Sequence, residues 1–322
     1  MRYIVLVNDG LSSICHEELS SLGVKPATIK IQGNVIQFEF SDEEKLKKLQ
    51  SIRRLLRYLD IKEDIGEKEK IDLKDDSRLA VLNSLSGHSF FVEVEHLKGQ
   101  ENRIDVAKKI SNAILANVKA DVNFKKPEIL IVAYHQDGKF YLGLDLGGEL
   151  NRRPYRVFPH SASFTGDYAF LLVKKTGFQK GDKLLVGFGK DGAVPIEAAR
   201  YSSEMVYYFD FSAQNVNAAR KNAQIAGVGA LVQINKCSVE DLDIKYDQNY
   251  FNKIIFHLTT KDETSINEIY SQSLYVLKKK GRMLLITRDS FDLSIHEKYK
   301  LISEDKLVRG ESIQKLWLLE KK

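Results

Sequence analysis

The chain has 322 residues, of which 43% are hydrophobic and 29% charged, and its formal net charge is +5. These values are typical of a globular protein of about two domains and argue against a disordered chain. No apolar run reaches the roughly 18 residues that a membrane-spanning helix needs, and MRYIVLVNDG at the start lacks the basic region of a signal peptide.

The two cysteines and the mild positive charge give further limits. Cys15 and Cys237 lie far apart in the sequence, with no nearby histidine cluster. This argues against a disulfide framework and against a metal site, and it favours a cytoplasmic protein. A net charge of +5 is compatible with nucleic-acid binding, but an ordinary solvated surface explains it equally well.

Residues 1–60 predict a small α/β unit. Arg2–Val7 is expected to be a strand and Ser12–Leu22 a helix, and two further strands flank the turn at Gly33 and Asn34. From residue 41 to about residue 59 we predict one helix. It begins with a capping box (Ser41 and Glu44), and its apolar residues recur with a period near 3.6: Leu46, Leu49, Ile52, Leu55, Leu56 and Leu59.

Residues 61–150 predict a second α/β unit, with helices at 76–85 and 102–118 and strands at 90–97, 129–133 and 140–146. Residues 151–165 are expected to form a linker. From residue 166 to residue 322, strands alternate with helices, which indicates a parallel, doubly wound sheet. We expect strands near 183–187, 205–210, 230–235, 252–257 and 281–287, and helices near 193–202, 212–226, 264–279 and 290–298. Two strands without an intervening helix end the chain, the last of them antiparallel.

A glycine-rich turn follows the first strand of this sheet. LLVGFGKDGAVPIEAA contains the pattern G-x-G-x-x-G at Gly187, Gly189 and Gly192, and Asp210 ends the next strand. Glycines of this spacing let a backbone approach a ligand, and the acidic residue binds ribose hydroxyls. The pattern is compatible with NAD, with S-adenosylmethionine (SAM), or with a tight turn that holds no ligand.

The wider sequence resembles one family over nearly the whole chain. The segments PIEAAR, VYYFDFSAQNVNAARKNAQIAGV, LGLDLGGELNRRPYR, HEELSSLG and GNVIQFEF occur in the order found in THUMP-domain RNA methyltransferases. Within that family they are most similar to the archaeal and bacterial tRNA guanosine-N2 methyltransferases. The resemblance implies a ferredoxin-like region (1–60), a THUMP RNA-binding region (61–150) and a Rossmann-like, seven-stranded SAM-methyltransferase domain (166–322).

The resemblance also implies a cofactor site. SAM would lie against Gly187, Gly189, Gly192, Asp210 and Ser238, without a metal. The family's D-P-x-C-G-S-G-T motif, however, has its aspartate at Val186 here, and a glycine of the second motif is replaced by Tyr208. Valine cannot accept the hydrogen bond that holds the methionine part of SAM, and Asp191 replaces it only if the loop is rebuilt.

The family's base-binding motif is changed as well. Its Asn/Asp-Pro-Pro-aromatic sequence aligns with His257, Leu258, Thr259 and Thr260. His257 is the one strong acceptor among these four and is the candidate catalytic residue. Its alternative role is that of an ordinary polar loop histidine. Since the motif normally fixes the target amino group and stacks on the base, its replacement predicts lost or weak methyl transfer.

RNA binding needs none of these altered residues. By resemblance, the partner is RNA, specifically the acceptor stem of tRNA; a protein partner is not identified, and a membrane is not expected. The candidate contacts are Lys98, Arg103, Lys108, Lys109, Arg152, Arg153, Tyr155 and Arg156. For Lys108 and Lys109 a solvated helix face is an equal alternative. For residues 152–156, RNA contact or packing at a domain interface is favoured over a plain linker.

Three functions follow from these observations. The first is an RNA-binding homologue whose methyl transfer is lost or weak. The second is an active SAM-dependent tRNA guanosine-N2 methyltransferase with a divergent site. The third, an NAD-linked oxidoreductase, depends on the glycine pattern alone.

Overall fold

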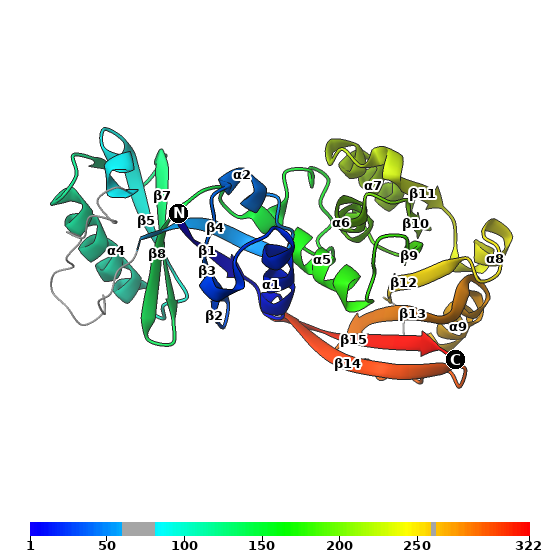
Figure 1. Ribbon diagram of the computed structural model, residues 1–322. Helices are drawn as coiled ribbons and strands as arrows, with labels where there is room; N and C mark the ends of the chain where they lie inside the picture. The colour runs from blue at the N-terminus through cyan, green and yellow to red at the C-terminus, as the bar shows by residue number, and fades with distance from the viewer. Residues whose placement is uncertain (60–80, 259–261) are drawn as a thin grey trace. The chain divides into compact units, whose positions relative to one another are not determined.

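The computed structural model describes residues 1–59, 81–258 and 262–322, which form two compact units, residues 1–150 and 151–322 (Figure 1). Residues 151–165, predicted as a linker, are part of the C-terminal unit. The predicted boundary between residues 60 and 61 lies outside the described residues. In the parts that the structure describes, no helix is both long enough and apolar enough to cross a membrane.

The N-terminal unit is built on one mixed sheet with the order β2-β3-β1-β4-β8-β7-β5-β6. Its strands are β1 (Arg2–Val7), β2 (Lys30–Gln32), β3 (Val35–Glu39), β4 (Ile52–Leu59), β5 (Ser89–Glu95), β6 (Asp121–Val122), β7 (Ile129–Gln136) and β8 (Lys139–Asp145). Strand β4 pairs with β1 on one side and with β8 on the other. The two regions predicted as ferredoxin-like and THUMP therefore share one sheet.

Three helices of the N-terminal unit are α1 (Ser12–Ser21), α2 (Glu43–Leu46) and α4 (Gln100–Leu115). Helix α4 confirms the helix predicted at 102–118, and it buries an apolar stripe that includes Val106, Ile110 and Ile114. Of the helix predicted at 76–85, residues 76–80 lie outside the described residues, and Asn83–Leu85 form a short 3-10 turn.

The helix predicted from residue 41 to residue 59 is wrong. Only Glu43–Leu46 is helical, and Ile52–Leu59 is strand β4. Because β4 is interior to the sheet and buried over much of its length, its sequence IRRLLRYL does not alternate between apolar and polar residues. Its apolar positions therefore fit a helical period as well as they fit a strand.

The C-terminal unit contains a seven-stranded sheet with the order β11-β10-β9-β12-β13-β15-β14. The strands are β9 (Leu184–Gly187), β10 (Val206–Asp210), β11 (Val232–Lys236), β12 (Phe251–His257), β13 (Leu277–Arg288), β14 (Tyr299–Arg309) and β15 (Ser312–Lys321). Strands β9 to β13 are parallel, and β15 lies antiparallel between β13 and β14. This arrangement confirms the predicted Rossmann-like α/β fold.

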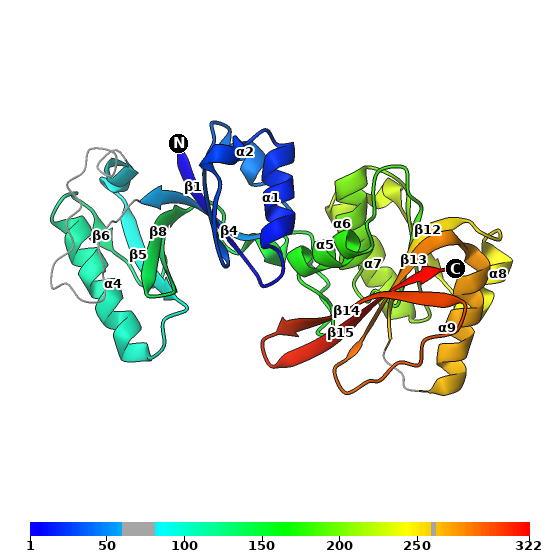
Figure 2. The same cartoon turned by 60° about the horizontal axis from the view of Figure 1, so that its bottom comes forward.

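Helices cover both faces of this sheet (Figures 1 and 2). They are α5 (Gly166–Lys175), α6 (Ala193–Ser202), α7 (Ala213–Ile225), α8 (Leu242–Lys245) and α9 (Glu263–Val276). Helices α8 and α9 join a core with Leu185, Phe209 and Phe256. The helix predicted at 290–298 is wrong, because residues 289–298 connect β13 to β14 without a helix. Phe291 and Leu293 are nevertheless buried, which explains the apolar pattern.

Candidate functional site

The strand order reverses between β9 and β12, which are neighbours in the sheet but not in the chain. In open α/β sheets, ligands bind at the carboxyl ends of the strands at such a reversal. Here β9 ends at Gly187 and β12 ends at His257. Gly187 pairs with Phe256 on one side and Phe209 on the other, so the glycine turn and His257 lie at the same edge.

The glycines of the turn are explained by packing within the protein. A Cβ on Gly187 would lie 2.6 Å from the rings of Phe209 and Phe256, and a Cβ on Gly192 would lie 2.7 Å from Ala219. Gly192 also has a φ of 81°, which favours glycine. Close packing therefore requires glycine at both positions, whether or not a ligand binds.

Tyr208 occupies the space beneath the glycine turn. It is fully buried, and it is registered beside Val186 in the sheet. Its hydroxyl donates to the backbone carbonyl of Lys190 (2.9 Å), and its ring would lie 3.0 Å from a Cβ on Gly189. The side chain that replaces the family's glycine therefore supports the turn from below.

Asp210, the predicted ribose ligand, is also engaged within the protein. Its carboxylate is buried and accepts hydrogen bonds from the Tyr208 hydroxyl (3.3 Å), the Ser212 backbone N–H (2.9 Å) and the Asn215 amide (3.0 Å). An ionised carboxylate can accept about four hydrogen bonds, so three donors leave Asp210 little capacity for a ligand. Asp210 therefore holds the start of α7 and the Tyr208 ring in place.

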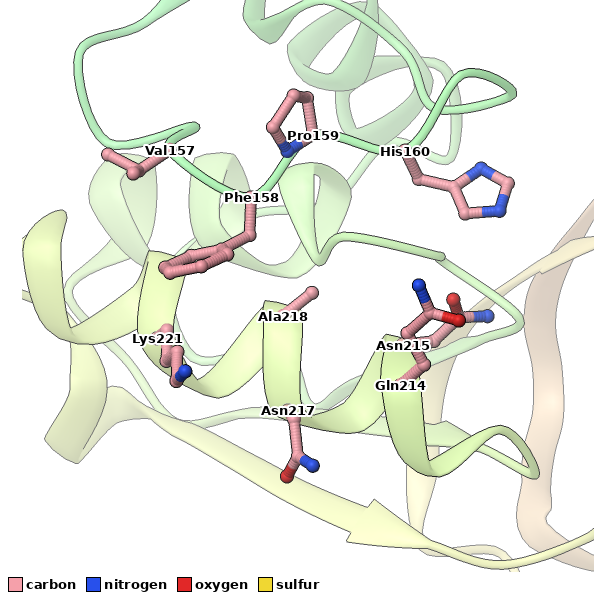
Figure 3. Close-up of a pocket in the computed structure, with 9 residues that line it drawn as sticks. All are labelled: Val157, Phe158, Pro159, His160, Gln214, Asn215, Asn217, Ala218 and Lys221. Atoms are coloured by element: carbon pink, nitrogen blue, oxygen red, sulfur yellow. The ribbon is translucent and has the colours of Figure 1, made fainter.

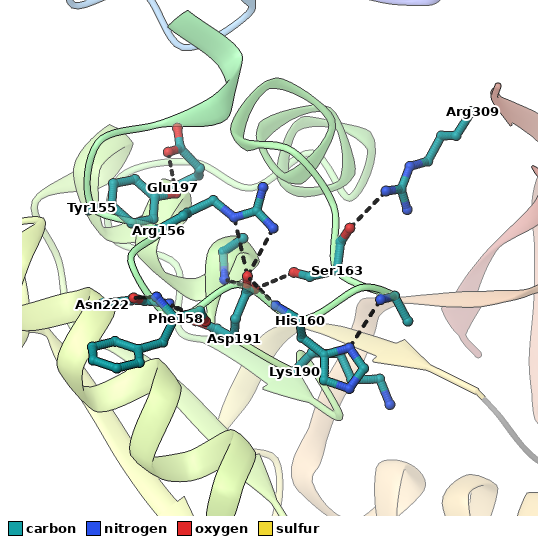
Figure 4. Close-up of polar contacts among 12 residues, drawn as sticks. Tyr155, Arg156, Phe158, His160, Ser163, Lys190, Asp191, Glu197, Asn222 and Arg309 are labelled. Atoms are coloured by element: carbon teal, nitrogen blue, oxygen red, sulfur yellow. Dashed lines mark hydrogen bonds and ion pairs between the residues drawn. The ribbon is translucent and has the colours of Figure 1, made fainter.

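Asp191 is a second buried carboxylate, and it anchors the segment that precedes α5 (Figure 4). It accepts from Arg156 (2.9 Å), from the Ser163 hydroxyl and from the backbone N–H of His160 (3.3 Å). All three donors come from residues 156–163. Asp191 is thus committed to this segment and does not replace the carboxylate missing at Val186.

These residues do not fit the charged methionine part of SAM. Val186 is buried and apolar, and the cavity that it lines with Gly189 and His257 has a volume of about 10 Å³. That volume holds about one water molecule at most. Among the described residues that line this cavity, no carboxylate is present to bind the ammonium group, and the volume is too small for it.

His257 lies at the same edge, against the ring of Phe164 with 5.5 Å between centroids. Burial lowers the pKa of His257 to about 4, and the positive charges of Lys190, Arg309 and Arg288 act in the same direction. The imidazole is therefore neutral at neutral pH and can accept a hydrogen bond. Its neighbours in the predicted base-binding motif, Thr259 and Thr260, lie outside the described residues.

A cavity of about 360 Å³ adjoins His257. Phe188, Phe211 and Leu258 contribute apolar walls. Ser238, predicted to contact the cofactor, lines it too, but the Ser238 hydroxyl and backbone N–H both pair with Asp241. This volume lies within the range of small-molecule sites, roughly 300–1,000 Å³.

The predicted RNA contacts at residues 152–156 divide into buried and exposed members. Arg153 and Tyr155 are buried, and both bond to the buried carboxylate of Glu197 on α6, at 3.0 and 2.7 Å. Arg156 pairs with Asp191, and Arg152 is exposed. The burial of Arg153 and Tyr155 favours packing over RNA contact for these two residues. Sequence analysis did not find Glu197, their partner.

The remaining predicted RNA contacts lie on or just before α4. Lys98, Arg103 and Lys108 are exposed, whereas Lys109 pairs with Asp105 at 3.0 Å. Exposure at three of these positions leaves the cations accessible, and their contact with RNA stays a prediction.

Comparison with known families gives a match that lies within the C-terminal unit. Residues 189–317 are similar to the family model described as "Methyltransferase domain". The match begins inside the glycine turn and ends in β15, so it includes every strand of the sheet except β9.

Curated relatives of known activity match parts of the chain. A tRNA (guanine(6)-N2)-methyltransferase from Methanocaldococcus jannaschii is 26% identical over 62% of this chain. The ribosomal RNA large subunit methyltransferase K/L of Buchnera aphidicola is 28% identical over 32% of it. The matched regions span 56% and 16% of the length of these relatives.

Solved structures share the fold over the whole chain. TrmN from Thermus thermophilus superposes with a TM-score of 0.76 at 18% identity, covering 100% of this chain and 99% of that one. SMU.472, crystallised with SAH, gives a TM-score of 0.71 at 16% identity over 100% and 98% of the chains. At these identities the likeness establishes the architecture of both units.

Proposed function

We propose that the protein is a cytoplasmic RNA-binding member of the THUMP methyltransferase group whose methyl transfer is lost or weak. The observation that carries this proposal is the closed turn after β9. Tyr208 fills the space below it, Val186 stands where a carboxylate is needed, and about 10 Å³ remains.

The charge around the closed turn supports the same proposal. SAM carries a positive sulfonium and a positive ammonium group. Lys190, Arg288 and Arg309 are near enough to His257 to lower its pKa. Positive groups facing a positive cofactor weaken its binding.

RNA binding is supported by the N-terminal unit and by the relatives. The solved TrmN structure shares both units, and the matched curated proteins methylate tRNA or ribosomal RNA by name. Exposed cations at Lys98, Arg103 and Lys108 supply charge for phosphate contacts. We infer that the bound RNA is a tRNA, and that its acceptor stem is the segment recognised.

The alternative, an active tRNA guanosine-N2 methyltransferase with a divergent site, is favoured by one observation. The neutral His257 imidazole adjoins a cavity of about 360 Å³, in which a ring could be held. In that case His257 would accept a hydrogen bond from the target amino group.

A radiolabelled-methyl assay on unmodified total tRNA distinguishes the RNA-binding homologue from the active methyltransferase. We expect no transfer by the parent protein, and none after residues 257–260 are replaced by Asn-Pro-Pro-Tyr, because Val186 still leaves the cofactor unheld. Transfer by the parent that falls at least about a hundredfold in His257→Ala, with tRNA binding unchanged, would establish the active enzyme instead.

A further inference from the structure

A third, larger cavity lies between α7 and residues 157–160, beside the glycine turn (Figure 3). Its volume is about 620 Å³, well within the range of small-molecule sites. Phe158 and His160 project from one wall, and Gln214, Asn217 and Lys221 of α7 form the other. None of the residues that line it is acidic.

The aromatic wall is exposed and rigidly held. Phe158 is 42% exposed. Its backbone N–H donates to the side-chain oxygen of the buried Asn222, and the Asn222 amide donates back to the Phe158 carbonyl, both at 3.2 Å. These bonds hold the Phe158 backbone, so the exposed ring projects from a fixed point of the chain.

Cationic and donor groups lie beside the ring. The Lys221 ammonium is 4.7 Å from the Phe158 centroid, and Lys221 has no ion pair among the described residues. The Nδ1 of His160 accepts from the backbone N–H of Ala162 (3.1 Å), so in the neutral imidazole Nε2 carries the proton. Both side chains can therefore donate to an anionic oxygen.

Amide groups complete the set. Asn215 is engaged with Asp210, but the Gln214 amide has no hydrogen bond within the described parts of the chain. The side-chain oxygen of Asn217 accepts only a long bond from Arg220 (3.4 Å), which leaves its NH2 group available. Side-chain amides present a donor and an acceptor together, as the edge of a nucleobase requires.

We propose that this cavity binds a nucleotide, with the base stacked on Phe158, the phosphate at Lys221 beside that ring, and Gln214, Asn217 and His160 offering hydrogen bonds along the rest of the hollow. An aromatic ring, a cation and amides around one hollow are the groups that recognise an unstacked nucleotide. Its source is an unpaired segment of RNA or a free nucleotide. The RNA source depends on the proposed RNA-binding function.

The test uses the full-length protein and a short single-stranded RNA that contains 2-aminopurine, whose fluorescence is quenched by stacking. We expect the parent to quench the probe. Phe158→Ala should abolish the quenching and weaken binding about tenfold, and Lys221→Gln should weaken binding severalfold. The matched controls Ile244→Ala and Lys180→Gln remove an exposed apolar side chain and an exposed lysine elsewhere in this unit and should change neither quantity.

Two competitors distinguish the source. Displacement of the probe by AMP at micromolar concentration indicates a free nucleotide, whereas displacement by unlabelled single-stranded RNA alone indicates an RNA segment. Equal binding and quenching by the parent and Phe158→Ala would overturn the proposal. Binding of total tRNA to the parent is measured in parallel. A parent that binds tRNA but does not quench the probe lacks this nucleotide site, whereas a parent that does not bind tRNA contradicts the proposed RNA-binding function.

Discussion

The hydroxyl of Tyr208 donates a hydrogen bond of 2.9 Å to the backbone carbonyl of Lys190. A buried strand residue is thereby joined to the top of the glycine turn, at a position where Lys190 has a φ of 57°. Non-glycine residues adopt such angles only where neighbouring contacts stabilise them. The ring and the hydroxyl of Tyr208 both contribute to holding the turn closed.

Tyr208→Phe should lower the free energy of unfolding by about 1–2 kcal/mol, because the O–H that the Lys190 carbonyl and the Asp210 carboxylate share is lost while the ring remains. Tyr208→Ala should lower it by about 3–5 kcal/mol, since it also leaves a cavity. Urea denaturation of both variants measures the difference. Similar losses in the two variants would mean that the ring does not support the turn.

Arg153→Ala should destabilise the protein by about 2–3 kcal/mol, because it removes one of the two guanidinium groups that pair with the buried Glu197 carboxylate, leaving Arg200 at 2.9 Å. Arg152→Ala, at the exposed neighbouring position, should cost less than about 1 kcal/mol. Chemical denaturation of the two single variants is the measurement. If Arg153→Ala instead weakens RNA binding and leaves stability unchanged, the packing role assigned to Arg153 is wrong.

Regular alternation of strands and helices made the C-terminal fold predictable from sequence. The prediction of a helix where β4 lies failed for a physical reason. A strand that is buried on both faces loses the alternation of apolar and polar residues that identifies strands. At the site, the family resemblance located the altered motif positions Val186, Tyr208 and His257. The sequence could not show that Asp191 pairs with Arg156 or that Glu197 pairs with Arg153, because the two residues of each pair lie more than thirty positions apart.

Replacing Lys98, Arg103 and Lys108 together by Gln should weaken tRNA binding and reduce its dependence on salt. Each phosphate contact contributes up to about 0.9 to the slope of log K against log salt, without regard to sequence. Affinities measured between about 0.05 and 0.2 M salt give that slope. The matched triple variant Lys180→Gln, Lys279→Gln, Lys280→Gln removes the same charge from exposed positions of the other unit. Equal slopes for both triple variants would exclude α4 as the RNA surface.

Stability should depend on pH through His257. Its pKa is lowered to about 4 in the folded protein, from 6.5, so below pH 6.5 the unfolded chain takes up a proton that the folded protein does not. This pKa difference leaves the free energy of unfolding unchanged above pH 6.5. As the pH falls from 6.5 towards 4, it lowers the free energy of unfolding by up to about 3 kcal/mol. Denaturation of the parent and His257→Gln across this range checks it. If the free energy of unfolding falls equally with pH in the parent and in His257→Gln, groups other than His257 cause the pH dependence.

The central claim is that the turn after β9 no longer holds SAM, and isothermal titration of the full-length protein with SAM tests it most directly. Losing one charge-assisted hydrogen bond costs roughly 1.5–3 kcal/mol, or about ten- to a hundredfold in affinity, and the closed cavity weakens binding further. We predict a Kd weaker than about 100 μM, or no measurable heat. Micromolar binding, or SAM retained through purification, would contradict the account.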